Sequence, residues 1–324
     1  MGITSMELAR VCGISRGTVD RALKGRPGVN KATRERVLAA AQKYGYRPNL
    51  IGQTLVSGKS NTIGVILFDF SHDFFAELYS EFEQTADQYG FVTFPVLSYH
   101  NPEREMECIR RLLDRRVDGI IMLPVNKDEA FENFLLSLPI PVATVANRLS
   151  DRFAFSGPDN RKASFEAAGR LFASGHRRIH YYSPTLGKKT TANRYAQEER
   201  RNGWADARNS LNFSGEEHHF LSGLLNTLQP GDAVMVSSDF YALELQAELR
   251  ENHPALFPSI TLMGFDGLAI LRLFARKIAT VSFSRKYWAQ VAMAQIHGLI
   301  EGKMVEDRIV PHTIILPDES GRNA

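Results

Sequence analysis

The sequence predicts an α/β protein that begins with a small helical head. Two observations carry this prediction. Apolar residues in the first ~45 positions recur at the three-to-four spacing of short helices. From residue 62 onwards, apolar runs of strand length alternate with stretches of helix length, in two successive sets. Strands that are apolar on both faces and separated by helices are typical of a parallel, doubly wound sheet. Two such sets predict two similar subdomains with a cleft between them.

Length and composition limit the classes of protein that the chain can belong to. With 324 residues, 44% hydrophobic and 23% charged, we expect two or three globular domains. We find neither an apolar run of about 18 residues nor a signal-peptide core, so we expect a cytoplasmic protein with no membrane partner. Cys12 and Cys108 lack metal-ligand spacing, so we expect reduced structural cysteines, no metal and no cofactor.

The charge is distributed unevenly along the chain. Residues 1–60 carry 11 Lys and Arg against 3 Asp and Glu, whereas the remainder carries 28 against 33. A basic head on a mildly acidic body indicates a module that neutralises phosphates. A membrane-surface segment or an interaction tail is the alternative. The well-formed caps and the apolar periodicity of the head favour a folded unit.

Residues 4–29 predict two short helices joined by a tight turn. Thr4 and Glu7 have the spacing of a capping box at the start of the first helix. Ser15 starts the second helix, and Gly13 supplies the positive φ that the turn between them needs.

The same segment has the packing pattern of a helix-turn-helix. Small Ala9 lets the helices approach, and Val19 fixes the second helix on the first. Arg16, Thr18 and Arg21 then point outward, which favours contact with DNA. An ordinary helical hairpin with a solvated basic face is the structural alternative.

A third helix closes the head. Asn30 caps it, Val37, Leu38 and Ala41 form its expected buried stripe, and it ends at Gly45. Residues 49–61 are short and contain glycine, so by composition they form a linker.

The body is expected to contain at least nine strands and six helices. Strands are expected at 62–70, 91–98, 117–124, 141–147, near 155, and at 177–184, 232–238, 259–266 and 278–284. Helices are expected at 74–90, 104–116, 161–175, 200–211, 240–252 and 287–303.

Four stretches of the N-terminal region resemble one known family. The runs ELARVCGIS, TVDRALKGRPGV, TRERVLAAAQKYGYRPN and SGKSNTIGVIL look like the N-terminal third of the LacI/GalR family of bacterial transcription regulators. The resemblance implies a helix-turn-helix DNA-binding domain at 1–48, a hinge helix at 49–61 and a periplasmic-binding-protein-like type I body at 62–320. Its N-subdomain would span 62–158 plus 285–320, and its C-subdomain 159–284.

The resemblance also implies which residues touch DNA. Side chains at the start of the second helix would enter the major groove, and a hinge leucine would wedge into the minor groove. The implied set is Thr4, Ser15, Arg16, Gly17, Thr18, Arg21, Asn30 and Leu55. Two positions depart from the family pattern. Gly52 replaces the usual alanine and weakens a helix, and Asp20 would either repel phosphates or orient Arg21 or Arg16.

Ligands of open parallel sheets bind beyond the carboxyl ends of the strands. Asp69, Asn147 and Asp266 end strands, and Phe74 begins the helix after the first strand. The family resemblance adds further contacts, above all Arg200 three residues before Gly203. A structural salt bridge between an arginine and an aspartate at the strand ends is the alternative interpretation of Arg200 and Asp266. The implied effector-binding set is Asp69, Phe74, Asn147, Arg148, Arg200, Phe220, Ser238, Asp239 and Asp266. His72, Asp73 and Ser238 depart from residues common in the family's sugar sites, and Phe75 is expected in the core.

Catalytic motifs do not stand out in the sequence. We find no GxSxG elbow between a strand and a helix and no GxxxxGK[ST], GxGxxG or HExxH pattern, and adjacent His218 and His219 in a strand would face opposite sides. We therefore expect no enzyme.

The expected protein is a cytoplasmic homodimer, with a tetramer left open, that binds a pseudo-palindromic operator. It would most simply be a repressor of carbohydrate-utilisation genes that responds to a monosaccharide or a derivative of one. A nucleobase- or nucleoside-responsive regulator and a sugar-binding receptor for transport are the alternatives.

Overall fold

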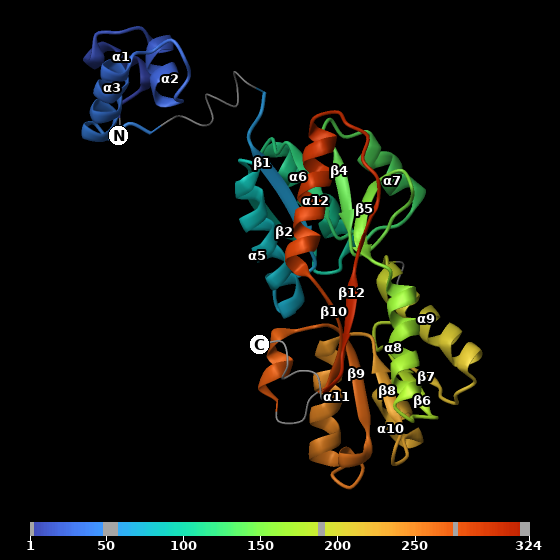
Figure 1. Ribbon diagram of the computed structural model, residues 1–324. Coiled ribbons are helices and arrows are strands. Elements are labelled where there is room, and N and C mark those ends of the chain that lie inside the picture. Colours follow the sequence, from blue (N-terminus) through green and yellow to red (C-terminus); the bar gives the residue numbers. More distant parts are fainter. Residues whose placement is uncertain (1–2, 48–57, 187–191, 275–277, 318–324) are drawn as a thin grey trace. The chain divides into compact units, whose positions relative to one another are not determined.

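The computed structural model describes residues 3–47, 58–186, 192–274 and 278–317 (Figure 1). The chain divides into two compact units, residues 1–60 and 61–324. Most of the expected hinge, including Gly52 and Leu55, lies outside the described residues. No described helix combines the length and the apolar character needed to cross a membrane.

The head consists of α1 (Ser5–Cys12), α2 (Arg16–Leu23) and α3 (Lys31–Lys43). The predicted capping box is confirmed: Glu7 N donates to Thr4 Oγ1 at 3.3 Å, and Thr4 N donates to Glu7 Oε2 at 2.7 Å. Ser15 and Asn30 cap α2 and α3, also as predicted. Gly13 and Gly45 both have positive φ. Local sequence therefore sets every helix start in this unit.

The core of the head differs from the prediction at one position. Ala9 and Val19 are buried, but Leu38 is 46% exposed. Val37 and Ala40 form the buried stripe of α3, because positions three apart lie on one face of a helix and position 38 is turned away by about 100°. The buried set is Leu8, Ala9, Cys12, Val19, Ala22, Val37 and Ala40.

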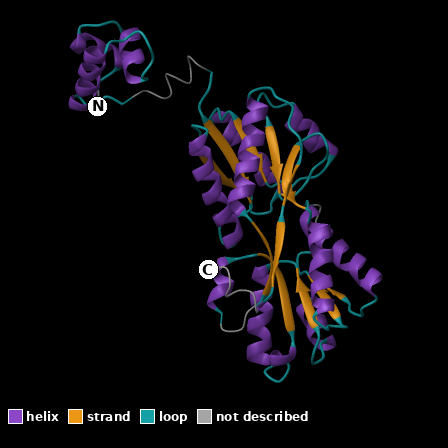
Figure 2. Ribbon diagram, in the orientation of Figure 1, coloured by secondary structure: helices purple, strands orange, loops and turns teal. Residues whose placement is uncertain are grey.

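The first subdomain of the body is a sheet flanked by helices (Figure 2). The sheet has six strands, all parallel, in the order β11-β5-β4-β3-β1-β2. Its strands are β1 (Thr62–Leu67), β2 (Val92–Leu97), β3 (Gly119–Met122), β4 (Val142–Val145), β5 (Ala154–Pro158) and β11 (Arg308–Val310). Its helices are α5 (Asp73–Gln88), α6 (Pro102–Asp114), α7 (Glu129–Leu136) and α12 (Arg285–Ile300).

Both faces of this sheet are covered, which explains why its inner strands are largely apolar and buried. Along β1, Ile63 and Val65 belong to the cluster that includes α5 and α12 residues. Ile66 belongs instead to the cluster with Ile109 of α6 and Phe131 of α7. Successive side chains of a strand point to opposite faces, so a strand with helices on both sides must be apolar at every position.

The second subdomain repeats the arrangement in the order β12-β10-β9-β8-β6-β7. Its strands are β6 (Ile179–Tyr182), β7 (Glu217–His218), β8 (Ala233–Val236), β9 (Thr261–Asp266), β10 (Ala279–Phe283) and β12 (His312–Ile315). Its helices are α8 (Asn160–Ala173), α9 (Tyr195–Leu211), α10 (Leu221–Thr227), α11 (Asp239–Asn252) and the 3₁₀ turns η1 (Phe257–Ser259) and η2 (Ala269–Leu273).

The expected assignment of 285–320 to the first subdomain is only partly right. Helix α12 packs on α5 and on β3, β4 and β5, and β11 extends the first sheet. Strand β12, however, pairs with β10 of the second sheet. The pairing is antiparallel because the chain enters this sheet from the first subdomain, against the direction of β10.

Helices α8 and α9 approach each other closely at Gly203. A Cβ at this position would lie 2.0 Å from the carbonyl oxygen of Arg161 on α8, so only glycine fits. The neighbouring Trp204 is buried and donates from Nε1 to Ile179 O at 3.0 Å. These contacts fix α9, which carries Arg200.

Candidate functional site

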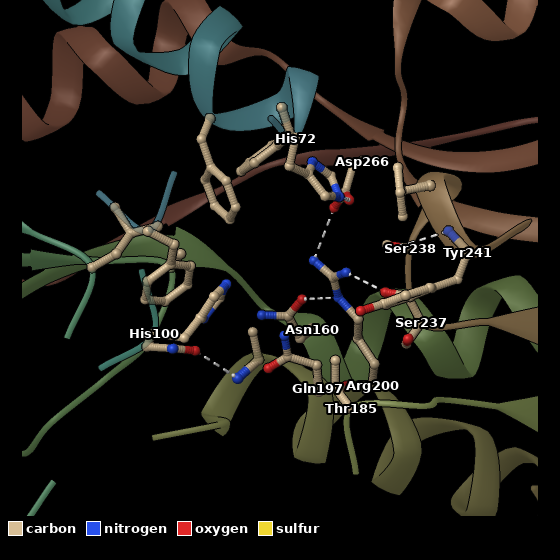
Figure 3. Close-up of a pocket in the computed structure, with 18 of the residues that line it drawn as sticks. His72, His100, Asn160, Thr185, Gln197, Arg200, Ser237, Ser238, Tyr241 and Asp266 are labelled. Carbon is tan, nitrogen blue, oxygen red and sulfur yellow. Dashed lines mark hydrogen bonds and ion pairs between the residues drawn. The ribbon is translucent and has the colours of Figure 1, made fainter. Parts of the chain in front are cut away.

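A cavity of about 240 Å³ lies between the two subdomains of the body (Figure 3). It opens at the ends of β1, β8 and β9, where parallel sheets ordinarily bind ligands. The residues that line it from the first subdomain are Phe68, Asp69, Ser71, His72, Phe74, Phe75, His100, Leu123, Ala146, Asn147, Pro158 and Trp288. Its lining from the second subdomain is Asn160, Thr185, Ala196, Gln197, Arg200, Ser237, Ser238, Phe240, Tyr241 and Asp266.

Arg200 is the centre of the polar side of the cavity. Its Nε donates to Asn160 Oδ1 at 2.8 Å, its Nη1 to Ser237 O at 2.6 Å and its Nη2 to Asp266 Oδ1 at 3.2 Å (Figure 3). The guanidinium also lies over the ring of Phe265 at 4.5 Å. A guanidinium has five N–H groups, and these bonds use three of them. The arginine is therefore held in one orientation at the cavity wall.

Asp266 is buried and has an unusual backbone conformation. Its φ is 108°, in the region that residues with a Cβ rarely adopt. Burial raises the pKa of Asp266, although Arg200, His72 and Arg285 act to lower it. The guanidinium of Arg200 lies 3.2 Å from this carboxyl group. We therefore infer that Asp266 is ionised at neutral pH.

The opposite wall of the cavity is aromatic. Phe74 and Phe75 of α5 meet edge to face with centroids 5.4 Å apart, and Trp288 of α12 lies 5.9 Å from Phe74. His72, just before α5, lies 5.6 Å from the ring of Phe240 on the second subdomain. Its Nε2 is 4.0 Å from Asp266 Oδ2. Aromatic faces and a polar wall thus enclose the same space.

Asp69 organises the loop that carries His72. One carboxylate oxygen, Oδ1, accepts from the backbone and hydroxyl of Ser71 and from His72 N. The other oxygen lies 3.7 Å from His100 Nε2. Burial acts to raise the pKa of Asp69, but these hydrogen bonds and His100 outweigh it and lower the pKa.

Among the described residues, three that line the cavity each have a buried polar atom without a hydrogen-bond partner. The atoms are His72 Nδ1, Gln197 Oε1 and Ser237 Oγ. Buried polar groups are ordinarily paired, and leaving them unpaired costs free energy. Because these atoms have almost no exposed surface, a ligand in the cavity would reach them only after the side chains turn toward it.

The structure brings six of the predicted effector residues to this cavity. They are Asp69, Phe74, Asn147, Arg200, Ser238 and Asp266. Ser238 also caps α11, and Asn147 also ties the subdomains together: it accepts from Ala196 N at 3.1 Å and donates to Asn193 O at 3.2 Å.

Three predicted effector residues lie elsewhere. Arg148 is occupied by Asp151 and Asp307, since the chain turns away from the cavity after Asn147. Phe220 is 70% exposed, because it follows β7 at the outer edge of the second sheet.

Asp239 is buried behind the wall rather than in it. It accepts hydrogen bonds from Leu268 N at 2.8 Å and from Thr280 Oγ1 at 2.7 Å. Burial and the neighbouring Asp266 raise the pKa of Asp239 well above its ordinary value. Its place fits a support for the turn that follows β9.

The cavity also contains residues that the sequence analysis missed. Phe75 lines the cavity although it was expected in the core. Gln197 was detectable in principle, because it lies three residues before Arg200 on one face of α9. Phe240 and Tyr241 follow the capping Ser238, and no sequence pattern marked them.

The candidate nucleic-acid interface is the outer face of α2. Arg16, Gly17 and Arg21 are exposed, and Thr18 is half-buried. The hydroxyl groups of Ser15 and Thr18 are 2.9 Å apart. Thr4 and Asn30 lie at the starts of α1 and α3, where their side chains cap the helices.

Asp20 pairs with neither of the arginines considered for it. It lies 2.8 Å from Lys24 Nζ and 4.0 Å from Arg26 Nη1. Arg16 and Arg21 are thus not oriented by this carboxylate.

Comparison with known proteins identifies the family. A model described as periplasmic binding proteins and sugar binding domain of LacI family matches residues 60–232, more than half of the chain. A model of the lacI family of bacterial regulatory proteins matches residues 6–49. The chain belongs to the LacI family. It is a ligand-responsive, DNA-binding transcription regulator, as the sequence predicted.

Two relatives resemble this chain over most of their length. Catabolite control protein A from Priestia megaterium is 28% identical and is covered to 98%, with 97% of this chain matched. The regulator GalS from Salmonella typhimurium is 28% identical, with 90% of this chain and 88% of GalS matched. The Lac repressor dimer bound to operator has a TM-score of 0.83 at 19% identity, with 98% of both chains covered, and shows the same fold.

Proposed function

We propose that this LacI-family regulator responds to an uncharged ligand of monosaccharide size that binds between its subdomains. The observation that carries the proposal is the compensated charge of Arg200, which already faces Asp266. Asp69 adds a second carboxylate to the lining. A phosphate group would need cationic partners, whereas sugar hydroxyls match alternating donors and acceptors beside aromatic rings.

The size of the cavity supports a small ligand. Sites for drug-sized ligands have volumes of roughly 300–1,000 Å³, and this cavity has about 240 Å³. One relative is named catabolite control protein A, which agrees with a carbohydrate-related role.

We further propose a repressor that binds a pseudo-palindromic operator as a homodimer, in the compartment that holds the DNA, without a catalytic step of its own. Arg16, Gly17, Thr18 and Arg21 would contact bases, and Leu55 would enter the minor groove. The effector would shift the population of subdomain arrangements and so the affinity for operator.

A thermal-shift screen tests the effector. The panel contains glucose, galactose, ribose and fructose, their phosphate esters, adenine and adenosine. At 100 times its Kd, a ligand stabilises the protein by about 2.7 kcal/mol. We expect a shift with an uncharged sugar and not with its ester. Asp266→Asn should abolish the shift, whereas the control Asp206→Asn, in an exposed pair with Arg161, should retain it. A shift with the esters or the purines alone would contradict the proposal.

Selection of duplexes from a random DNA pool tests the DNA side. The selected duplex should lose about 10³-fold in affinity between 50 and 200 mM salt if six or more phosphates are contacted. A variant restricted to residues 61–324 should retain the effector shift and lose DNA binding. A transport receptor would instead select no duplex with the full chain.

A further inference from the structure

Arg285 contacts both subdomains of the body. Its Nη2 donates to Asp266 O at 2.8 Å and to Gly267 O at 3.2 Å, the last residue of β9 in the second subdomain and the residue that follows it. Its Nε lies 2.7 Å from Glu77 Oε2 on α5 of the first subdomain. The guanidinium is largely buried, with 14% of the side chain exposed. One side chain therefore joins a strand end of one half to a helix of the other.

The turn that Arg285 holds is strained. Asp266 has a φ of 108° and Gly267 a φ of 64°. A residue with a Cβ persists in this region only where its surroundings fix it. Thr280 fixes the turn from behind, because its Oγ1 accepts from Gly267 N at 3.1 Å. Arg285 fixes the same turn through its carbonyl groups.

The turn also forms part of the cavity wall. The carboxylate of Asp266 lies between Arg200 and His72, while the carbonyl of the same residue is bound by Arg285. Because the strained backbone leaves little freedom, a ligand that displaces this carboxylate must also displace the carbonyl. The displacement then acts on Arg285.

The contact with the first subdomain is suited to an adjustable link. The Nε of Arg285 is within ion-pair distance of Glu77 but makes no well-directed hydrogen bond to any residue that the structure describes. The guanidinium also lies 5.4 Å from the ring of Phe74, which lines the cavity. An ion pair depends on distance more than on direction, so it tolerates a small rotation of the subdomains and is lost on a large one.

Arg285 lies where the chain passes from the second subdomain into the first. Strand β10 ends at Phe283 in the second sheet, Ser284 caps α12, and α12 begins at Arg285 and packs against α5. A rotation of one subdomain against the other must pass through this segment.

We propose that Arg285 is a latch between the subdomains: it ties the effector-contacting turn at Asp266–Gly267 to Glu77 and so couples occupancy of the cavity to the angle between the subdomains. Arg285 is a positioning residue in this proposal. The coupling rests on the proposed function, because it takes the cavity as the effector site.

Distance measurement by double electron–electron resonance tests the latch in the full chain. Spin labels are placed at Arg110→Cys on α6 and Asn252→Cys on α11, both exposed and on different subdomains. Cys12 and Cys108 are buried, which directs labelling of the native protein to the introduced sites. The variants are Arg285→Gln, Glu77→Gln, their combination and Arg285→Lys. Arg161→Gln, which removes an exposed pair within the second subdomain, is the control.

We expect Arg285→Gln and Glu77→Gln each to at least double the width of the distance distribution. The double variant should be no wider than either single one, because the same link is lost. Arg285→Lys should be intermediate, since lysine keeps the charge but lacks the planar fork. The control should match the unmodified protein.

An unchanged distribution in both single variants would overturn the latch, even if their melting temperatures fell. Additive broadening in the double variant would also overturn it. If Arg285→Gln does not fold, Glu77→Gln and Arg285→Lys decide the question. No effector or DNA is present, so failure of the latch and failure of the proposed function are distinguishable.

Discussion

The two subdomains share one strand order, yet they contribute different chemistry to the cavity. The order is β2-β1-β3-β4-β5-β11 in the first and β7-β6-β8-β9-β10-β12 in the second. The first half contributes chiefly rings, including Phe74, Phe75 and Trp288. The second half contributes the ion pair of Arg200 and Asp266 together with several hydroxyl and amide groups.

Both halves use a buried carboxyl group to hold a strand-end loop. In the first, Glu105 of α6 accepts from Val125 N at 2.7 Å and from Asn126 N at 2.9 Å, after β3. In the second, Asp239 of α11 accepts from Leu268 N, after β9. Repetition of the fold thus repeats the scaffold, while the residues that face the cavity differ. In the proposed effector site, the second half would orient the ligand and the first half would enclose it.

Among the substitutions considered, loss of Arg200 should have the largest effect on stability and on effector binding. Arg200→Met leaves the buried carboxylate of Asp266 without its partner, which should destabilise the body by about 3–5 kcal/mol and abolish effector binding. Urea unfolding followed by tryptophan fluorescence measures it, since Trp204 and Trp288 both lie in the body. The control Arg161→Met, in an exposed pair, should cost at most about 1 kcal/mol. Equal losses in the two variants would remove the special role of the second half.

Substitutions in the aromatic wall should distinguish a loss of effector affinity from a loss of stability. Phe74 is 5% exposed, so Phe74→Ala should cost about 3–5 kcal/mol as well as effector affinity. Phe240 is 41% exposed, so Phe240→Ala should cost about 1 kcal/mol while weakening the effector. The same unfolding curves and the thermal-shift titration test both. If Phe240→Ala left the effector's affinity unchanged, the wall would not extend to the second half.

Glu105 should give the first half a pH dependence of its own. Burial raises the pKa of Glu105 to about 7, against 4.5 for the ordinary group. The folded state therefore binds more protons between these values, and stability falls as the pH rises from 4.5 to 7. The total for a shift of this size is about 3 kcal/mol.

Urea unfolding at pH 5, 6 and 7 should be measured for the unmodified protein and for Glu105→Gln, which cannot titrate. The variant should lack the part of the pH dependence of stability that comes from Glu105. Glu107→Gln, on an exposed position of the same helix, should keep it. Parallel slopes in all three proteins would contradict the shifted pKa.

Asn147 should show the smallest of these effects. Asn147→Ala leaves Ala196 N without its acceptor and removes a tie between the subdomains, which should cost about 1–3 kcal/mol. Effector affinity should fall less than in Arg200→Met, because the amide is already bound within the protein. A complete loss of effector binding with stability unchanged would instead make Asn147 a direct contact.

The head was predictable in detail because its determinants are local. Thr4 with Glu7, Ser15 and Asn30 each act within one helical turn, and the structure shows each of them as a cap. The one error, Leu38, concerns the choice between adjacent positions on a helix, which depends on where the other helices lie.

The cavity was predictable only where a strand end or a family motif marked the residue. Asp69, Asp266 and Arg200 have such marks, and they do line the cavity. Phe220 and Arg148 had comparable support and lie elsewhere, because their loops turn away at the sheet edge and after Asn147. The role of Asp239 behind the wall depends on its distance from Leu268 and Thr280, which no spacing in the sequence gives.

The sequence by itself determined the alternation of strands and helices, the helix caps and the basic head, because period, capping and charge act over a few neighbouring residues. The tertiary structure decided which side chains meet between the subdomains. Arg285 shows the reason most clearly: it lies 208 positions from Glu77 and 19 from Asp266, and only the packing of α12 on α5 beside the end of β9 brings the three together.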